Sequence, residues 1–154
     1  MHGHHAECRA AAWTDEWSTT VTEPLPAAVE AKIDVVSSLQ APPIPGSEMM
    51  TIVVTSPAGC PGTPPHRHSG PAFGYVIEGE VRFELEGEPV RVVKSGETFW
   101  EPGGDVIHYQ DGNNLDNAET KFVVMMFGVP GQPMLTLVSA EELEERRPRR
   151  FTQP

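Results

Sequence analysis

The chain has 154 residues, and 22 Asp and Glu against 11 Lys and Arg give it a formal net charge of -11. Nucleic acids and anionic membranes attract basic surfaces, so neither is expected as a partner. A chain of this length can bury the core of one domain without disulfides, and its 14 Gly and 16 Pro indicate many turns and short strands.

Residues 1–46 are interpreted as an N-terminal arm followed by an edge segment. Residues 1 to 20 show no hydrophobic period, and the histidines of the MHGHH run form the kind of terminal cluster that binds metal adventitiously. The segment AAVEAKIDVVSSL, 27–39, remains open between two structures. Its Val-Val pair favours an edge strand, whereas its Ala-Glu-Ala-Lys favours a short helix.

Residues 47–138 are predicted to form a barrel of short strands. In VRFELE, Val81, Phe83 and Leu85 alternate with charged residues, which indicates a strand with one buried face. The run KFVVMMF, 121–127, is apolar on both faces, so it is buried on both sides, or on one side by a partner chain. Turn residues separate the apolar runs about every ten residues, which is typical of an all-β antiparallel sandwich or barrel. The runs are 49–55, 73–79, 80–87, 88–96, 97–104, 106–112 and 121–129.

Residues 139–154 are predicted to form a short C-terminal helix and tail. Ser139 followed by Glu142 fits a capping box that starts a helix through AEELEERR, and Pro148 ends it. The basic RRPRRF run that follows is interpreted as a solvated helix end that complements the helix dipole, rather than as a docking site.

The two cysteines give an indication of the cellular compartment in which the protein resides. Cys8 and Cys60 lie far apart and form no C-x-x-C pair, which we interpret as two thiols in a reducing compartment. No run of 18 apolar residues is long enough to span a membrane, and the N-terminus lacks the apolar core of a signal peptide. A cytoplasmic location is therefore expected.

Three histidines within the barrel region are candidate metal ligands. His66 and His68 are two residues apart, so on a strand both imidazoles point to the same face. His108 follows several strands later, and an antiparallel barrel can bring it to the same interior point. Three imidazoles on strands suit one divalent transition metal. Histidines that are hydrogen-bonded within the core are the alternative, and spacing alone leaves both open.

The region 59–113 resembles the two conserved motifs of the cupin family, G-x5-H-x-H-x3/4-E-x6-G and G-x5-P-x-G-x2-H-x3-N. His66 and His68 match the first motif, with Gly79 at its closing glycine. The residues that match the second are Gly96, Pro102, Gly104, His108 and Asn113, the last two slightly late in register. The resemblance implies a small jelly-roll-like cupin barrel. It also implies one metal ion (Fe, Zn, Ni, Mn or Cu) on His66, His68 and His108.

Two positions depart from the first motif. Cys60 stands where its opening glycine belongs, and Ala72 stands where cupins carry a glutamate ligand. A metal held by neutral imidazoles alone keeps its full charge, so we expect a stronger Lewis acid that attracts an anionic, chelating substrate. The missing ligand is also expected to leave an open coordination position.

Gln110 and Glu101 are candidates for a fourth ligand or a catalytic group. On a regular strand Gln110 shares the face of His108, which makes it the first candidate. A Pro-Gly-Gly turn lies between Glu101 and His108, so the rule that every second residue shares a face does not apply to Glu101. A solvated carboxylate is its alternative interpretation. A substrate pocket is expected to include Tyr75, Phe83 and Met126.

Together these features predict a metal-dependent enzyme, similar to three-histidine cupin dioxygenases, that acts on a small aromatic or dicarbonyl-like anion by oxygenase-type chemistry. Two alternatives stay open: a Lewis-acid polyketide cyclase or isomerase, and a cupin that binds a small ligand without catalysis. The apolar surface on both faces of 121–127 further predicts a homodimer.

Overall fold

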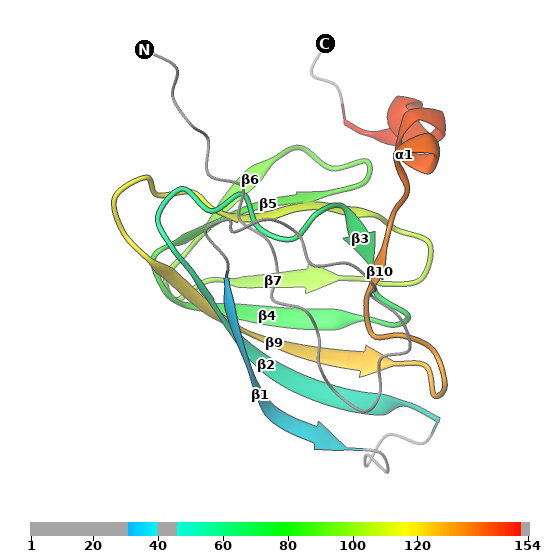
Figure 1. Ribbon diagram of the computed structural model, residues 1–154, viewed down its shortest axis with the longest axis horizontal. Helices are drawn as coiled ribbons and strands as arrows, with labels where there is room; N and C mark the ends of the chain where they lie inside the picture. Colours follow the sequence, from blue (N-terminus) through cyan, green and yellow to red (C-terminus); the bar gives the residue numbers. More distant parts are fainter. Residues whose placement is uncertain (1–30, 40–45, 152–154) are drawn as a thin grey trace.

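Short strands separated by tight turns build two facing antiparallel sheets in the computed structural model, which describes residues 31–39 and 46–151 (Figure 1). Within these residues, one sheet has the strand order β1-β2-β9-β4-β7 and the other the order β10-β3-β8-β5-β6. The expected all-β, jelly-roll-like barrel is thereby confirmed. The strands are β1 (Lys32–Leu39), β2 (Glu48–Ser56), β3 (His66–Arg67), β4 (Ala72–Glu78), β5 (Glu80–Leu85), β6 (Arg91–Lys94), β7 (Thr98–Glu101), β8 (His108–Asn113), β9 (Thr120–Gly128) and β10 (Thr136–Leu137).

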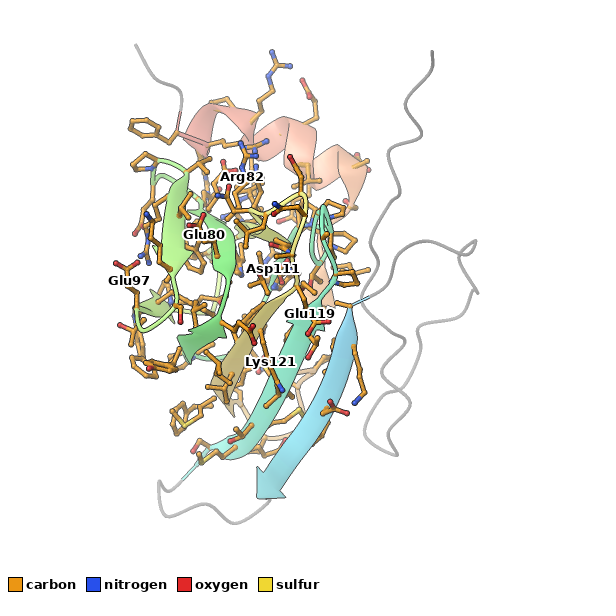
Figure 2. The ribbon with its side chains drawn as sticks, turned by 90° about the vertical axis from the view of Figure 1, so that its left-hand side faces the viewer. Glu80, Arg82, Glu97, Asp111, Glu119 and Lys121 are labelled. Atoms are coloured by element: carbon orange, nitrogen blue, oxygen red, sulfur yellow. The ribbon has the colours of Figure 1, made fainter. Side chains whose placement is uncertain are left out.

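The core lies between the two sheets, and the period-2 patterns of the sequence place it there. On β5, Val81 and Phe83 are fully buried while Arg82 between them is exposed. On β9, every second residue from Thr120 to Gly128 is buried and the residues between are half-buried. β9 is a central strand, paired with β2 along its whole length and with β4 on its other side. Charged turn residues such as Glu97 lie on the outside (Figure 2).

The first strand, β1, settles the open assignment of residues 27–39 where the structure describes them. Lys32–Leu39 is an edge strand that pairs antiparallel with β2, with an irregularity between Val35 and Ser37. The remainder of that segment, 27–30, lies outside the described residues, as do His2, His4 and His5.

The C-terminal helix α1 (Ala140–Arg146) is confirmed together with its predicted cap. The hydroxyl of Ser139 accepts a hydrogen bond from the backbone N–H of Glu142 at 3.2 Å. A short 3-10 helix, η1 (Arg147–Arg149), contains Pro148 and follows directly.

The basic end of this helix is not merely solvated, so that interpretation was wrong. The side chain of Arg146 is only 10% exposed, and its guanidinium donates to Glu86 at 2.9 Å and to Asp105 at 2.8 Å. Arg150 forms a second ion pair, with the buried Glu84, at 2.6 Å. These acidic partners lie 41 to 66 residues away in sequence, and the pairs attach the helix to the barrel.

Cys60 is disulfide-bonded rather than a thiol, which corrects the earlier interpretation. The other cysteine, Cys8, lies outside the described residues. The argument for a reducing compartment therefore loses its premise at Cys60. Among the described residues, no helix is long and apolar enough to cross a membrane.

Candidate metal centre

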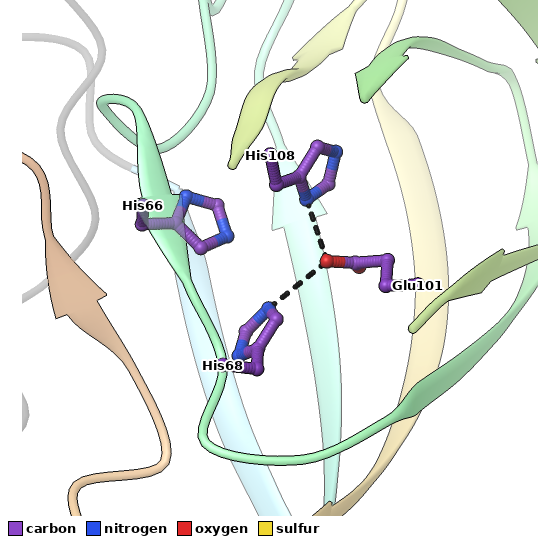
Figure 3. Close-up of side chains that lie close together, drawn as sticks. All are labelled: His66, His68, Glu101 and His108. Atoms are coloured by element: carbon purple, nitrogen blue, oxygen red, sulfur yellow. Dashed lines mark ion pairs between the residues drawn. The ribbon is translucent and has the colours of Figure 1, made fainter. Parts of the chain in front are cut away.

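Four buried side chains converge between the two sheets: His66, His68, Glu101 and His108 (Figure 3). One potential ligand atom from each lies within 4.8 Å of all the others. Each residue is less than 10% exposed. His66 is on β3 with His68 just beyond it, Glu101 ends β7 and His108 begins β8. The cluster thus joins the second sheet, which carries the histidines, to the first sheet, which carries the carboxylate.

The backbone orients the imidazoles. His66 and His108 are direct register partners across β3 and β8, and their ring centroids are 4.9 Å apart. Nδ1 of His66 lies 2.9 Å from the carbonyl oxygen of Pro64, and Nδ1 of His68 lies 2.8 Å from that of Met134. A carbonyl can only accept, so each Nδ1 carries a proton, and Nε2 is the atom that can bind a metal when the ring is neutral. Such bonds fix the tautomer and orientation of metal-binding histidines.

A glycine pair brings the end of β7 against the segment that carries His68. The N–H of Gly104 donates to the carbonyl oxygen of His68 at 2.8 Å. A Cβ atom on Gly103 would lie 2.0 Å from the carbonyl oxygen of Gly70, so no other residue fits without moving the backbone. The turn after Glu101 therefore needs glycine for close approach, and it holds that carboxylate beside His68.

Glu101 occupies the register position opposite Ala72 in the β4–β7 pair. Directly opposed residues on antiparallel strands have Cβ atoms roughly 5 Å apart, on the same face of the sheet. The carboxylate therefore enters the region that the family's glutamate would reach from position 72. Glu101 is 4% exposed, so the interpretation of a solvated carboxylate was wrong. The expectation of a site without a carboxylate fails with it.

The charges of the cluster are coupled. One oxygen of Glu101, Oε2, lies 3.2 Å from Nε2 of His68 and 2.9 Å from Nδ1 of His108 (Figure 3). Burial alone would raise the pKa of Glu101, but the neighbouring His108 and His68 lower it below its ordinary value. Burial likewise opposes charge on His108, but Glu101 outweighs it and raises the pKa of this histidine.

His66 behaves differently from His108. Burial, reinforced by the two other histidines, lowers its pKa to about 3. At neutral pH its ring is therefore neutral, with a lone pair available to a metal. Without a cation, the cluster holds a neutral His66 next to a charged pair of His108 and Glu101.

The donor set fits a divalent metal ion. Both ring nitrogens of His108 are buried, and neither makes a hydrogen bond, although Nδ1 lies close to Glu101. No Lys or Arg of the described residues forms an ion pair with Glu101. Three imidazoles and one carboxylate can bind Fe, Mn, Ni, Cu or Zn, and such an ion would bind a ring nitrogen of His108 and compensate the charge of Glu101 in place of the histidines.

Gln110 does not join this cluster. Its side-chain nitrogen donates to Glu84 at 2.8 Å, outside the site. The β5–β8 register pairs Glu84 with Gln110 and Leu85 with His108, so Tyr109 is an extra residue on β8. This bulge reverses the faces to which the side chains after His108 point. Gln110 therefore does not share the face of His108, and the prediction from a regular strand fails.

A cavity between the sheets adjoins the cluster and has about 590 Å³ of empty space, including the part open to solvent. Met126 lines it, as expected. Phe83 is instead buried behind the cluster, with its ring centroid 4.6 Å from that of His108. Tyr75 is 42% exposed and faces away from the cavity. Asp111, Thr63 and Ser56 also line the cavity, and the sequence had singled out none of them.

Comparisons with known proteins give one family and several structural relatives. A family profile described as a cupin domain matches residues 52–126. A cupin-like protein from Thermotoga maritima is 17% identical, with a TM-score of 0.55 over 80% of this chain and 86% of that one. No curated protein matches the chain.

Enzymes are among the similar structures. An oxalate oxidase in complex with the substrate analogue glycolate is 25% identical, with a TM-score of 0.54 over 82% of this chain and 66% of that one. The DMSP lyase DddQ from Ruegeria pomeroyi is 21% identical, with a TM-score of 0.55 over 70% of this chain and 51% of that one. The chain thus spans about two thirds of the oxidase and about half of the lyase.

Proposed function

Because the chain belongs to the cupin superfamily, we propose that it is a metal-dependent enzyme acting on a small organic anion by oxygenase-type chemistry. One observation carries the proposal. Four buried donor atoms lie within 4.8 Å of one another, at the wall of a cavity that opens to solvent. A metal needed only for structure has no use for such a cavity, whereas a catalytic one needs room for its substrate.

The residues around the cluster have separable tasks. His66, His68, Glu101 and His108 would hold the ion, and the Nδ1 bonds to Pro64 and Met134 keep two of the rings in place. When bound, the ion supplies a Lewis acid for an anionic oxygen ligand and, if it is iron, manganese or copper, a redox centre. Glu101 offsets one unit of its charge, so the site is less electrophilic than three histidines alone would make it.

The opposite wall of the cavity is apolar and includes Ile52, Val124 and Met126. Such a wall excludes water and suits the body of an aromatic or dicarbonyl-like substrate, which is the class we propose. The likeness to an oxalate oxidase supports oxygen-dependent chemistry over the cyclase or isomerase alternative.

The test begins with metal content. A variant in which His2, His4 and His5 are replaced by alanine removes the adventitious terminal cluster, and elemental analysis of tag-free protein should find one transition metal per chain. His66→Ala in the same background should lose it. A protein without bound metal in the first variant would overturn the proposal.

Oxygen uptake is then measured with the metal-loaded protein and a panel of 1,3-diketones, polyphenols and short carboxylic acids. We expect consumption with at least one of them and none with His66→Ala. Conversion that proceeds equally well without oxygen would support the Lewis-acid alternative instead. Binding of a panel member without any conversion would support the binding protein.

A further inference from the structure

A second polar group lies in the cavity, apart from the metal cluster, and consists of Asp111, Thr63 and Ser56. In the view of Figure 2, Asp111 lies between β5–β6 on one side and β1–β2 on the other. Asp111 is the register partner of Phe83, whereas His108 is that of Leu85, two residues further along β5. Two residues of a strand correspond to roughly 7 Å, so this group is within reach of a small molecule held at the metal.

Burial raises the pKa of the Asp111 carboxyl, and the nearby His108 offsets this effect only in part. Both of its carboxylate oxygens accept hydrogen bonds from Thr63, one from the backbone N–H at 2.5 Å and one from the hydroxyl at 2.7 Å. Both donors are neutral, and each oxygen retains a further lone pair. No Lys or Arg of the described residues forms an ion pair with Asp111. A carboxylate inside a protein without a cation is unfavourable, so a positively charged ligand would stabilise it.

Ser56 provides an independent observation. It is 1% exposed and lines the cavity, yet its hydroxyl has no hydrogen-bond partner in the described part of the chain. Buried polar atoms are almost always paired, so an unpaired one in a cavity wall indicates a ligand. Its carbonyl accepts a bond from Asn113, two residues beyond Asp111, which places both residues toward the same end of the barrel.

We propose that Asp111, Ser56 and Thr63 form a subsite for a protonated amine, and that the small organic anion bound at the metal also carries an amino group. The second part rests on the proposed function. An ammonium group has three donors, enough for the free lone pairs of Asp111 and for the Ser56 hydroxyl.

Charge selects the zwitterion over its competitors. A divalent ion, Glu101 and Asp111 sum to zero, and the described residues that line the cavity include no Lys or Arg. A dicarboxylate would bring two negative charges into this neutral, buried site, whereas a zwitterion adds none. The amine subsite therefore predicts that this site prefers a zwitterion to a small dicarboxylate.

The test compares three four-carbon ligands, 4-aminobutyrate, butyrate and succinate, by calorimetry on metal-loaded protein lacking the terminal histidines. We expect 4-aminobutyrate to bind at least about tenfold more tightly than butyrate, the size of one hydrogen bond to a charged group, and succinate to bind most weakly. Asp111→Asn should remove the preference for the amine and leave metal content unchanged, while butyrate should bind at least as tightly as before because the site then carries one net positive charge.

Ser56→Ala is the second variant, because a hydroxyl without hydrogen bonds can be removed without loss of stability. It should weaken 4-aminobutyrate binding and leave butyrate binding unchanged. Equal affinities in the wild type, a preference that survives Asp111→Asn, or tightest binding of succinate would each overturn the subsite. Metal content distinguishes the two failures: a wild type without metal refutes the proposed function, whereas a metal-loaded one without preference refutes only the amine subsite.

Discussion

Glu101 lies directly across the β4–β7 ladder from Ala72, the position where the resemblance to cupins places a glutamate. The carboxylate is therefore displaced to the neighbouring strand and still faces the same interior point. Opposed positions on an antiparallel pair are equivalent in depth and face, so one can replace the other without changing the barrel.

This equivalence can be tested by moving the carboxylate back. Glu101→Ala should lower metal affinity by about 10- to 100-fold, as loss of a coordinating or orienting group typically does. Adding Ala72→Glu to that variant should restore much of the affinity, because the volume vacated at 101 receives the new side chain. Metal titration by competition with a chromophoric chelator measures both. Glu97→Gln, an exposed carboxylate in the turn before β7, is the control and should change nothing.

Gln110→Ala should leave metal affinity unchanged, because the side chain bonds Glu84 and lies outside the cluster. The free energy of unfolding should fall by about 1–2 kcal/mol, since the buried Glu84 loses a donor. Urea denaturation and metal titration of the same sample report the two effects. A loss of metal comparable to that of Glu101→Ala would show that Gln110 is a ligand after all.

The metal-free protein should lose stability as the pH falls from 6.5. His66 has a pKa of about 3 when folded, against an ordinary value of 6.5, so between these values the unfolded chain binds a proton that the folded chain does not. Each pH unit in this window should cost about 1.4 kcal/mol. His108 has a raised pKa, so its contribution is fully present below 6.5 and is lost only as the pH rises through its folded value.

Urea denaturation in the presence of a chelator, between pH 6.5 and 5.5, reports mainly this effect, because Glu101 and Glu142 stay ionised there in both states. Asp111, whose pKa burial raises, acts in the opposite direction, so the comparison with a His66 variant is needed. In His66→Gln, the slope of the free energy of unfolding against pH should fall by the amount that corresponds to about one proton. An unchanged slope in that variant would show that His66 is not the group responsible.

Arg146→Ala should lower the free energy of unfolding by about 3 kcal/mol, because it leaves the Glu86 carboxylate, whose side chain is 10% exposed, without its cation. Arg147 is the matched control in the next position. Its ion pair with Glu144 is about three-quarters exposed on both sides, so Arg147→Ala should cost less than about 0.5 kcal/mol. Equal losses in the two variants would refute the role assigned to Arg146.

We propose that the chain forms a homodimer through the outer face of β4 and β7. Trp100, Tyr75 and Ile77 are 52%, 42% and 45% exposed there, and none of them is charged. Two copies of a chain with a net charge of -11 approach most readily through such a face. Light scattering should show a dimer that Trp100→Glu converts to a monomer. Val92→Glu, an exposed position on the opposite sheet, should leave the dimer intact.

Local patterns predicted much of this molecule, and long-range register decided the rest. The alternation from Val81 to Phe83 and the Ser139 cap depend on neighbouring residues, so both could be derived from sequence, whereas Glu84 on the expected wet face is buried against Arg150. Glu101 was undervalued because its significance depends on which residue of β4 it faces. Gln110 was overvalued because the extra residue at Tyr109 leaves no mark in composition or spacing. The anchoring role of Arg146 depends on acidic residues that are distant in sequence.

The bond between His68 and the carbonyl of Met134 sets an order on the assembly of the centre. All four donor residues precede Met134 in the chain, so a nascent polypeptide that has emerged as far as His108 already holds every ligand. It does not yet hold the group that orients the His68 ring, nor β10, which pairs with β3. Metal captured before that segment has been synthesised would meet an incompletely ordered site. We therefore expect tight binding to follow completion of the chain.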